Sequence, residues 1–352
     1  MFSVGSIGAI GRGSYASIDP LWRIAGIAPR LDLRFAQNRS LVDAVSGQNL
    51  ITFTRASGGT YIDNTGQLQT AANNEPRFSH NPITGESLGL MIEDQQTNLL
   101  LNSGTLSTQN VAVTAVAHTL HFTGTGTITL SGASSAGPLA GTGAGEANRV
   151  SLTFTPAAGT LTLTVSGTVT NAQLETGAVR TSYIPTAGST VTRAGDVASI
   201  IGAAFSSWYQ QGEGTAYQDH DASLGVASRR IAVLHDNTTD NTIELIGSNS
   251  SGTAGNYFSV TTGGASQALL LSGPYAQGRQ KSASAYRTND FAYSRNGGNV
   301  LVDSSGSVPT SLTTLTIGLS AANVAAINST IRRLIFWSSR LSNDTLQVLL
   351  LR

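Results

Sequence analysis

Apolar and polar residues alternate one by one along much of this 352-residue chain, and no long segment repeats at the spacing of an α-helix. The clearest example is 160–165, which reads Thr-Leu-Thr-Leu-Thr-Val, and the segments 121–132 and 150–155 follow the same pattern. Successive side chains of a β-strand point to opposite faces of its sheet, so this alternation predicts strands with one buried face. We therefore predict an all-β protein built from antiparallel strands.

Tight-turn sequences separate the expected strands. The segment 63–66 reads Asp-Asn-Thr-Gly and 81–85 reads Asn-Pro-Ile-Thr-Gly, and such residues favour sharp chain reversals. An Asn-Gly pair at 296–297 lies between two strand-like runs, which is the strongest short hairpin signal. Helix is expected only in short pieces, and one of them is predicted near the C-terminus with Ser342 as its N-cap.

Composition supports this fold class. Only 11% of the residues are charged, against about 25% in an average globular chain. The chain has 39 glycines, as expected for many short strands joined by tight turns. Because 40% of the residues are hydrophobic and alternate regularly, disorder is a weaker interpretation than a packed β structure.

The charge balance and the missing cysteines exclude several classes of site. The formal net charge is +0 with a single lysine, Lys281, so the chain carries no basic footprint for nucleic acid. Without cysteine it has no disulfide and no thiolate metal site, and its stability must come from packing or oligomerisation. No stretch reaches the roughly 18 apolar residues of a membrane span, and 1–10 is too short and uncharged for a signal peptide. We expect no nucleic-acid partner, no membrane insertion and no cofactor.

One stretch resembles a known family. It contains Phe-Thr-Arg-Ala-Ser at 53–57, Thr-Tyr-Ile-Asp at 60–63, Pro-Arg-Phe at 76–78 and the run from Asn81 to Leu90, and it continues through 93–101. Together these motifs resemble the head spike or fibre domain of tailed-phage and prophage proteins over roughly 30–101. The resemblance implies a structural protein on the virion surface, made in the cytoplasm of a bacterial host, and it implies no catalytic residue.

Two further resemblances concern the rest of the chain. Residues 169–177 with Thr-Ser-Tyr-Ile-Pro-Thr at 181–186 resemble the closing strand of carbohydrate-binding-module-like jelly rolls in phage proteins. Residues 329–337 followed by Arg-Leu-Ser at 340–342, together with the Asn-Gly hairpin, resemble the end of a laminin-G/concanavalin-A-like jelly roll. These resemblances imply two antiparallel sandwiches and do not identify a ligand.

The expected organisation is an N-terminal arm followed by three β modules. The division is an attachment arm at 1–30, a head-spike-type module at 31–101, a small sandwich at 102–188, a linker at 189–200 and a concanavalin-A-like jelly roll at 201–352. The arm contains apolar residues but no amphipathic period, so it is expected to dock either on another subunit or on the chain's own domains. We expect a homo-oligomer, most simply a trimer, attached through the arm to phage capsid or tail proteins.

The enzymatic activity to consider for this chain is that of a polysaccharide depolymerase. A glycosidase requires two carboxylates about 5–9.5 Å apart. Glu93 and Asp94 are adjacent and would point to opposite faces of a strand, whereas Asp219 and Asp221 could share one face. The five histidines show no metal-ligand spacing. We therefore predict no catalytic residue, no metal and no enzymatic activity.

A glycan-binding site is predicted in the C-terminal jelly roll. The candidate residues are His235, Asp236, Asp240 and Asn241, which form a polar hairpin turn, and Tyr257, which could stack on a sugar face. An ordinary Asn/Asp-rich turn explains the hairpin residues more simply. The predicted function is thus a head spike, fibre or decoration protein that contacts host-surface glycans. The alternatives are a tail fibre or receptor-binding adhesin and, third, a depolymerase.

Overall fold

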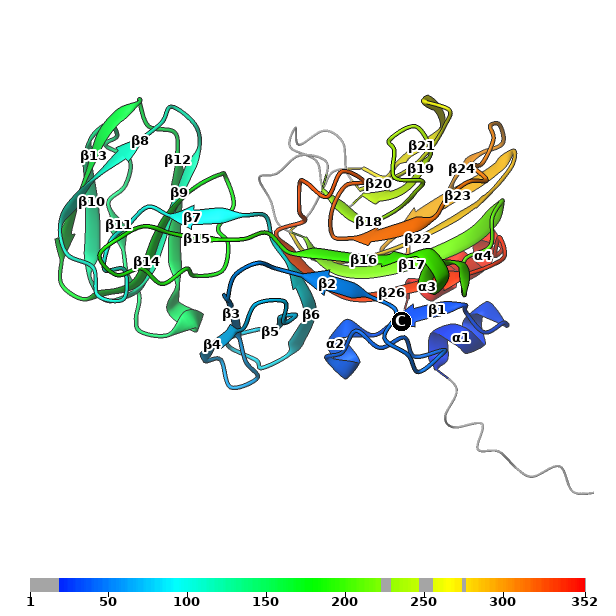
Figure 1. Ribbon diagram of the computed structural model, residues 1–352, viewed down its shortest axis with the longest axis horizontal. Coiled ribbons are helices and arrows are strands. Elements are labelled where there is room, and N and C mark those ends of the chain that lie inside the picture. The colour runs from blue at the N-terminus through cyan, green and yellow to red at the C-terminus, as the bar shows by residue number, and fades with distance from the viewer. Residues whose placement is uncertain (1–18, 223–228, 247–255, 274–276, 352) are drawn as a thin grey trace, which may run out of the picture.

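The computed structural model describes residues 19–222, 229–246, 256–273 and 277–351. Strands hold 46% of the residues and helices 8%, which confirms the predicted all-β class. The chain forms a large and a small β-sandwich that lie side by side (Figure 1). No helix in these described segments is long and apolar enough to cross a membrane.

The large sandwich consists of two antiparallel sheets. The first sheet has the order β24-β23-β22-β17-β26-β6-β5, and β1 pairs with β26 beside this path. Its strands are β24 (Leu301–Asp303), β23 (Asp290–Arg295), β22 (Gly278–Arg287), β17 (Glu213–Ala222), β26 (Ser329–Trp337), β6 (Ser87–Ile92), β5 (Phe78–His80) and β1 (Leu31–Leu33). The second sheet, in its spatial order, is β2 (Thr52–Thr54), β16 (Val197–Ile201), β25 (Thr314–Ile317), β18 (Arg230–His235), β19 (Thr242–Ile246), β20 (Tyr257–Thr262) and β21 (Ala265–Leu271).

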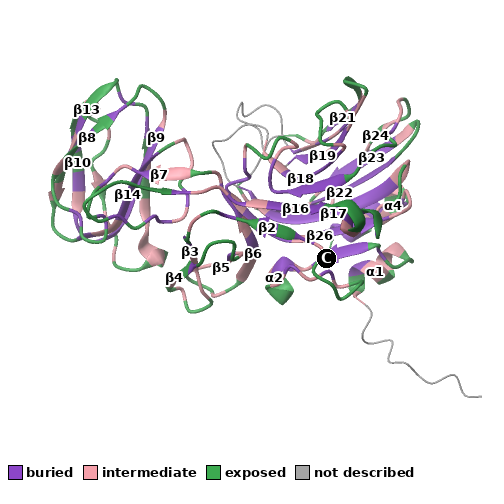
Figure 2. Ribbon diagram, viewed as in Figure 1, coloured by how far each residue is buried: buried purple, intermediate pink, exposed green. Residues whose placement is uncertain are grey.

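The core of the large sandwich draws on both ends of the chain. Leu31, Phe53 and Leu90 from the N-terminal part pack in one buried cluster with Leu315 and Phe336 from the C-terminal part. The buried stretches face one another across the two sheets (Figure 2). Residues 31–101 were expected to form a module of their own, but β1 and β6 pair with β26, and β2 pairs with β16. They complete the sheets of the C-terminal sandwich, so the expected boundaries at 101 and 201 do not separate independent sheets.

A glycine inside the family-like stretch permits this pairing. Gly89 of β6 has a φ of +91°, which side-chain-bearing residues rarely adopt. A Cβ at this position would lie 2.1 Å from the carbonyl oxygen of Ile331 in β26. The contact between the N-terminal strand and the C-terminal strand therefore requires glycine at this position.

The small sandwich has a core of its own, which also includes Leu100, just before the expected boundary at 102. Its four-stranded sheet is β11 (Leu139–Ala140), β10 (Thr127–Gly132), β13 (Gly159–Ser166) and β8 (Gln109–Val113), and its three-stranded sheet is β12 (Val150–Phe154), β9 (His118–Gly124) and β14 (Val169–Thr176). Leu120, Phe122, Ile128 and Leu163 belong to its own buried core. The alternating segment 121–132 is two strands rather than one, because the chain reverses between β9 and β10.

The small sandwich is inserted between two paired strands. β7 (Gln96–Asn98) enters it and β15 (Val191–Arg193) leaves it, and the two strands pair in the register Val191↔Asn98. Residues 189–200 were expected to be a linker, but they contain β15 and the first part of β16. A two-stranded hairpin, β3 (Gly59–Ile62) with β4 (Leu68–Ala71), lies beside this entry point (Figure 1).

Short helices cover the outer face of the first sheet. α1 (Pro20–Ala25) and α4 (Asn343–Leu349) pack together there, with Leu21, Leu346 and Trp337 in one buried cluster. Ser342 Oγ accepts a hydrogen bond from Thr345 N at 3.2 Å, which confirms the predicted N-cap of α4. The remaining helices are α2 (Phe35–Asn38), α3 (Gly202–Ser206) and a 3-10 turn at Glu146–Asn148. The 19–30 part of the expected arm therefore docks on its own chain, and residues 1–18 lie outside the described residues.

This topology predicts how fragments behave. Residues 201–352 expressed alone should not fold, because they lack β1, β2, β5, β6 and most of β16. Residues 96–188 should fold, because their core is closed within the fragment. Thermal unfolding followed by circular dichroism, with the full chain as control, tests both expectations. A cooperative transition in isolated 201–352 would contradict the interleaved topology.

Candidate functional site

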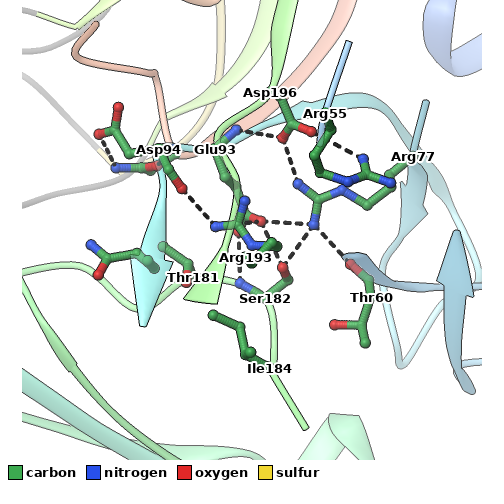
Figure 3. Close-up of polar contacts among 12 residues, drawn as sticks. Arg55, Thr60, Arg77, Glu93, Asp94, Thr181, Ser182, Ile184, Arg193 and Asp196 are labelled. Carbon is green, nitrogen blue, oxygen red and sulfur yellow. Dashed lines mark hydrogen bonds and ion pairs between the residues drawn. The ribbon is translucent and has the colours of Figure 1, made fainter. Parts of the chain in front are cut away.

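Five charged residues meet at the junction of the two sandwiches (Figure 3). We call them the joint cluster: Arg55, Arg77, Glu93, Arg193 and Asp196. Each is at most 4% exposed. Arg55 follows β2, Arg77 precedes β5, Glu93 follows β6, Arg193 ends β15 and Asp196 precedes β16. The family-like stretch and the expected linker thus contribute their charged residues to one buried site.

Two carboxylates are shared among three guanidinium groups in this cluster. Asp196 Oδ1 lies 3.1 Å from Arg55 Nη1, and its Oδ2 lies 2.5 Å from Arg77 Nη2. Glu93 Oε2 lies 2.8 Å from Arg77 Nη1 and 3.4 Å from Arg193 Nη2. Burial alone would raise the pKa of Glu93, but Arg193 and Arg77 outweigh it and lower that pKa to about 2. Glu93 therefore remains an ionised acceptor.

Backbone carbonyls stabilise the excess of positive charge. Arg55 Nη2 donates to Ala72 O at 2.7 Å, Arg77 Nη1 to Thr60 O at 2.9 Å and Arg193 Nη2 to Asp94 O at 2.8 Å. Such contacts matter because a buried charge is costly unless it is paired and hydrogen-bonded. The bonds also tie strand β3 and the loops at Ala72 and Asp94 to the cluster.

The cluster holds the small sandwich in place. Ser182 belongs to the Thr-Ser-Tyr-Ile-Pro-Thr segment, and it donates to Glu93 from its backbone N at 2.7 Å and from its Oγ at 2.6 Å. Thr60 Oγ1 donates to Tyr183 O at 2.6 Å across the same junction. These buried bonds fix the end of the small sandwich against the large one (Figure 3).

A cleft of about 430 Å³ lies beside the joint cluster, between the sandwiches. Serine and threonine residues line both walls, among them Ser151 and Thr153 of β12 and Thr330 of β26. Tyr61 of β3 and Tyr183 also line it. Clefts that combine an aromatic surface with a few polar groups are typical of small-molecule sites.

The acidic residues of the cleft are engaged by arginines. Glu146 accepts from Arg149 Nε at 2.7 Å and from its Nη2 at 2.5 Å. Asp221 Oδ2 lies 2.8 Å from Arg332 Nε, and Glu93 belongs to the joint cluster. Arg180 differs from these arginines, because no carboxylate of the described residues pairs with it and its Nη1 reaches only Arg149 O, at 3.4 Å.

A second hollow, of about 480 Å³, lies on the outer face of the first sheet. Its arginines are already paired: Arg279 Nε and Nη2 lie 2.9 and 2.6 Å from Asp219, and Arg333 Nε lies 2.8 Å from Asp32. Asp219 and Asp221 stand two residues apart on β17, a central strand of the first sheet, and each is paired with an arginine. A ligand in this hollow would have to break strong ion pairs, so we place the candidate site in the cleft.

The five residues predicted to bind glycan are not gathered into one site. Tyr257 pairs with Ile246, whereas the hairpin joins the opposite end of β19, where Thr242 pairs with Thr261. At about 3.4 Å per residue, four residues separate Tyr257 from the hairpin by about 14 Å along the strand. The structure brings His235, Asp236, Asp240 and Asn241 together, and leaves Tyr257 apart.

The polar groups of the hairpin mostly bond to one another. Asp236 accepts from Thr238 N at 3.1 Å and from Asn241 Nδ2 at 2.8 Å. His235 is buried, with its Nε2 2.8 Å from Thr316 Oγ1, and its pKa is lowered by burial. Asn241 Oδ1 accepts from Gly263 N at 3.0 Å. Among the described residues, the side chains of Asp240 and Tyr257 have no hydrogen bond of this kind, whereas His235, Asp236 and Asn241 do, as in an ordinary polar turn.

Sequence reasoning did not find the joint cluster or the cleft. Arg55 and Arg77 lie in the motifs Phe-Thr-Arg and Pro-Arg-Phe, and Arg193 lies in the expected linker within Thr-Arg-Ala-Gly-Asp at 192–196. The chain has only 20 cationic residues other than histidine. Repeated single arginines in strand-like, weakly charged surroundings were the available signal for buried ion pairs. No group of three or more metal-ligating side chains occurs among the residues that the structure describes.

Comparison with known proteins identifies no family. No family model and no curated protein matches the chain. Among solved structures, the CBM40 module of a Ruminococcus gnavus IT-sialidase bound to alpha2,6 sialyllactose has 16% identity and a TM-score of 0.34, covering 40% of this chain and 83% of that one. The NanB sialidase of Streptococcus pneumoniae has 10% identity and a TM-score of 0.35, covering 42% and 26%. TM-scores of this size do not place the chain in a family with these proteins.

Asp196 is predicted to be the most sensitive residue of the joint cluster. Asp196→Asn should lower the free energy of unfolding by about 3–5 kcal/mol, because Arg55 and Arg77 then lose a buried counter-charge. Urea denaturation measures the change. The control is Asp240→Asn on the exposed hairpin, which should change stability by less than about 0.5 kcal/mol. If the two variants had the same free energy of unfolding, the joint cluster would not contribute to stability as predicted.

Acid sensitivity is predicted from His220. It is fully buried on β17, neither ring nitrogen has a hydrogen-bond partner, and burial followed by the charge of Arg295 lowers its pKa to about 3. The folded state thus disfavours the protonated ring, so stability is complete above the ordinary pKa near 6.5 and falls as the pH drops from there toward 3.

Between pH 6.5 and 4.5 this histidine should contribute a slope of about 1.4 kcal/mol per pH unit. His220→Gln should reduce the measured slope by that amount, whatever its effect on stability at pH 7.5. Urea denaturation at a series of pH values tests it. An unchanged slope would show that His220 does not titrate in this way.

Proposed function

We propose that this protein is a structural protein on the surface of a phage particle, a head spike, fibre or decoration protein. We further propose that the cleft between its sandwiches contacts a glycan of the host surface. The observation that carries the glycan part is the cleft itself, about 430 Å³ in volume, lined by hydroxyl groups and the half-buried Tyr61 beside a buried joint. Hydroxyls exchange hydrogen bonds with sugar hydroxyls, and a tyrosine ring packs on the apolar face of a sugar.

The structural part rests on the resemblance of roughly 30–101 to phage head spike domains. The residues that carry this resemblance include Arg55, Arg77 and Glu93, which are buried in the joint cluster rather than exposed at a reactive site. A joint of this kind suits a protein that projects two sandwiches outward as one unit. In this proposal the chain is made in the host cytoplasm, assembles as a homotrimer and attaches to a capsid or tail protein through its N-terminal arm.

We propose binding without bond cleavage. A glycosidase needs one carboxyl group that holds a proton near neutral pH. The three acidic residues that line the described cleft are each paired with arginine, and the pKa of Glu93 is lowered to about 2. The lowered pKa keeps Glu93 ionised, and Glu146 and Asp221 are held in ion pairs with arginine, which argues against the depolymerase alternative.

Placement on the particle can be tested directly. Gold-labelled antibody against the small sandwich should mark the heads of intact particles in electron micrographs, and a chain beginning at residue 19 should fold yet fail to join particles. Labelling at the tail would replace the head spike by the adhesin alternative. Particles that carry no label would contradict the virion proposal.

Glycan contact predicts a specific difference between two tyrosines. Tyr61→Ala should weaken binding of host surface polysaccharide about tenfold, which corresponds to about 1.4 kcal/mol, because Tyr61 lines the cleft. Tyr257→Ala should leave binding unchanged, because Tyr257 lies on the second sheet. Calorimetry measures both, and a reducing-end assay on the same samples should stay negative. If Tyr257→Ala weakened binding and Tyr61→Ala did not, the binding site would lie on the second sheet near the hairpin and not in the cleft.

A further inference from the structure

The charge pattern of the cleft narrows the kind of glycan, if the proposed glycan contact is correct. We infer that the cleft takes an acidic sugar, whose carboxylate pairs with the guanidinium of Arg180. Arg180 is the charged group of the cleft that lacks an ion pair among the described residues, and hydroxyl groups lie beside it.

The first observation is that Arg180 has no counter-ion within the described structure. It lines the cleft, its side chain is exposed, and its one hydrogen bond is the 3.4 Å contact with the carbonyl oxygen of Arg149. The other cations around the cleft are paired: Arg149 with Glu146, Arg332 with Asp221, and Arg77 with Glu93. Arg180 is therefore the cation available to a ligand.

The second observation is that Glu146, a carboxylate of the cleft whose charge acts on Arg180, is not available to pair with it. Glu146 binds Arg149 through both oxygens, at 2.7 and 2.5 Å. Arg149 is held further by Asn171 O at 2.9 Å, and its guanidinium lies 5.6 Å from the ring centre of Tyr183. A bidentate pair fixed on several sides does not turn readily toward a third group.

The third observation is that Arg180 is held beside a like charge. Removal from bulk water and repulsion from Arg149 lower the pKa of Arg180, and the nearby charges of Glu146 and Glu175 raise it without outweighing them. An anion bound here would relieve that repulsion, whereas a neutral sugar would not. A carboxylate also matches the planar fork of a guanidinium group, which donates two parallel hydrogen bonds.

The remaining part of an acidic sugar would meet hydroxyl groups. Ser151 and Thr153 stand two residues apart on β12, so both project from the same face of the strand into the cleft. Both side chains are exposed. They lie on the same wall as Arg149 and Arg180, so one ligand can place its carboxylate on Arg180 and its ring hydroxyls on β12.

Matched pairs of acidic and neutral oligosaccharides test the inference on the full chain. The probes are galacturonate trisaccharide with galactose trisaccharide, and sialyllactose with lactose. In at least one pair the acidic member should bind about tenfold or more tightly than its neutral partner, and added salt should reduce the difference. Arg180→Gln should abolish the preference, and Arg180→Lys should keep part of it.

The matched control is Arg23→Gln, which removes another exposed arginine without an ion pair, on α1 and away from the cleft. It should leave the preference intact. If neutral members bind as tightly as acidic ones, or if Arg180→Gln keeps the preference, the acidic-sugar inference is overturned while glycan contact in the cleft stands. If no member of either pair binds, both the inference and the proposed glycan contact fall.

Discussion

The carboxylate of Asp196, shared between Arg55 and Arg77, connects parts of the molecule that are far apart in sequence. One oxygen holds the arginine after β2 and the other holds the arginine before β5, while the backbone N of Glu93 donates to the same carboxylate at 2.9 Å. Removing such groups from water is costly, and the cost is offset only when every partner is in place. The cluster therefore tolerates one arrangement of its strands, and it specifies how β2, β5, β6 and β16 meet.

The shape of the cleft follows from this constraint. Glu93 takes part in the ion pairs and also accepts two hydrogen bonds from Ser182, so the small sandwich is attached to a group that is itself immobilised. A cleft between two domains normally varies in width as the domains move, and loses affinity for that reason. Here one end of the cleft is closed by buried hydrogen bonds, which keeps Tyr61 and Tyr183 on fixed walls. The ion pairs with arginine also balance the charge of Glu93. In the inference drawn above, the unpaired guanidinium of Arg180 then gives the cleft its preference for acidic sugars.

Local features of the fold could be predicted from the sequence, because they depend on neighbouring residues. Alternation revealed β12 and β13, the Asn-Gly pair marked the turn between β23 and β24, and Ser342 marked the start of α4. The choice of strand partners is not a local property. β1 is a three-residue strand whose Leu31 pairs with Phe336. Neither segment contains a sequence feature that identifies the other as its partner. The family-like stretch therefore looked like a separate module, although it forms part of the C-terminal sandwich.

The same limit applies to the site. Asp236 and Asn241 have the chemistry of sugar ligands, but these groups also stabilise a tight turn, and the structure shows them used in that way. Arg180 lies in a stretch without any motif, and only the position of Glu146 next to Arg149 shows that it is left without a counter-ion. Burial and ion pairing decide which charged side chains can bind a ligand, and neither property can be read from the residues adjacent in sequence.

From the position of the inserted sandwich we expect the joint cluster to form last during folding. Arg55, Arg77 and Glu93 precede the insertion, and Arg193 and Asp196 follow it. Before the chain returns through β15, Arg55 and Arg77 face a single carboxylate, so their desolvation is not offset. The small sandwich has only local partners and can close first, and its closure brings β15 beside β7. Only then do Arg193 and Asp196 reach the junction, so the joint cluster is complete only when both sandwiches have formed around it.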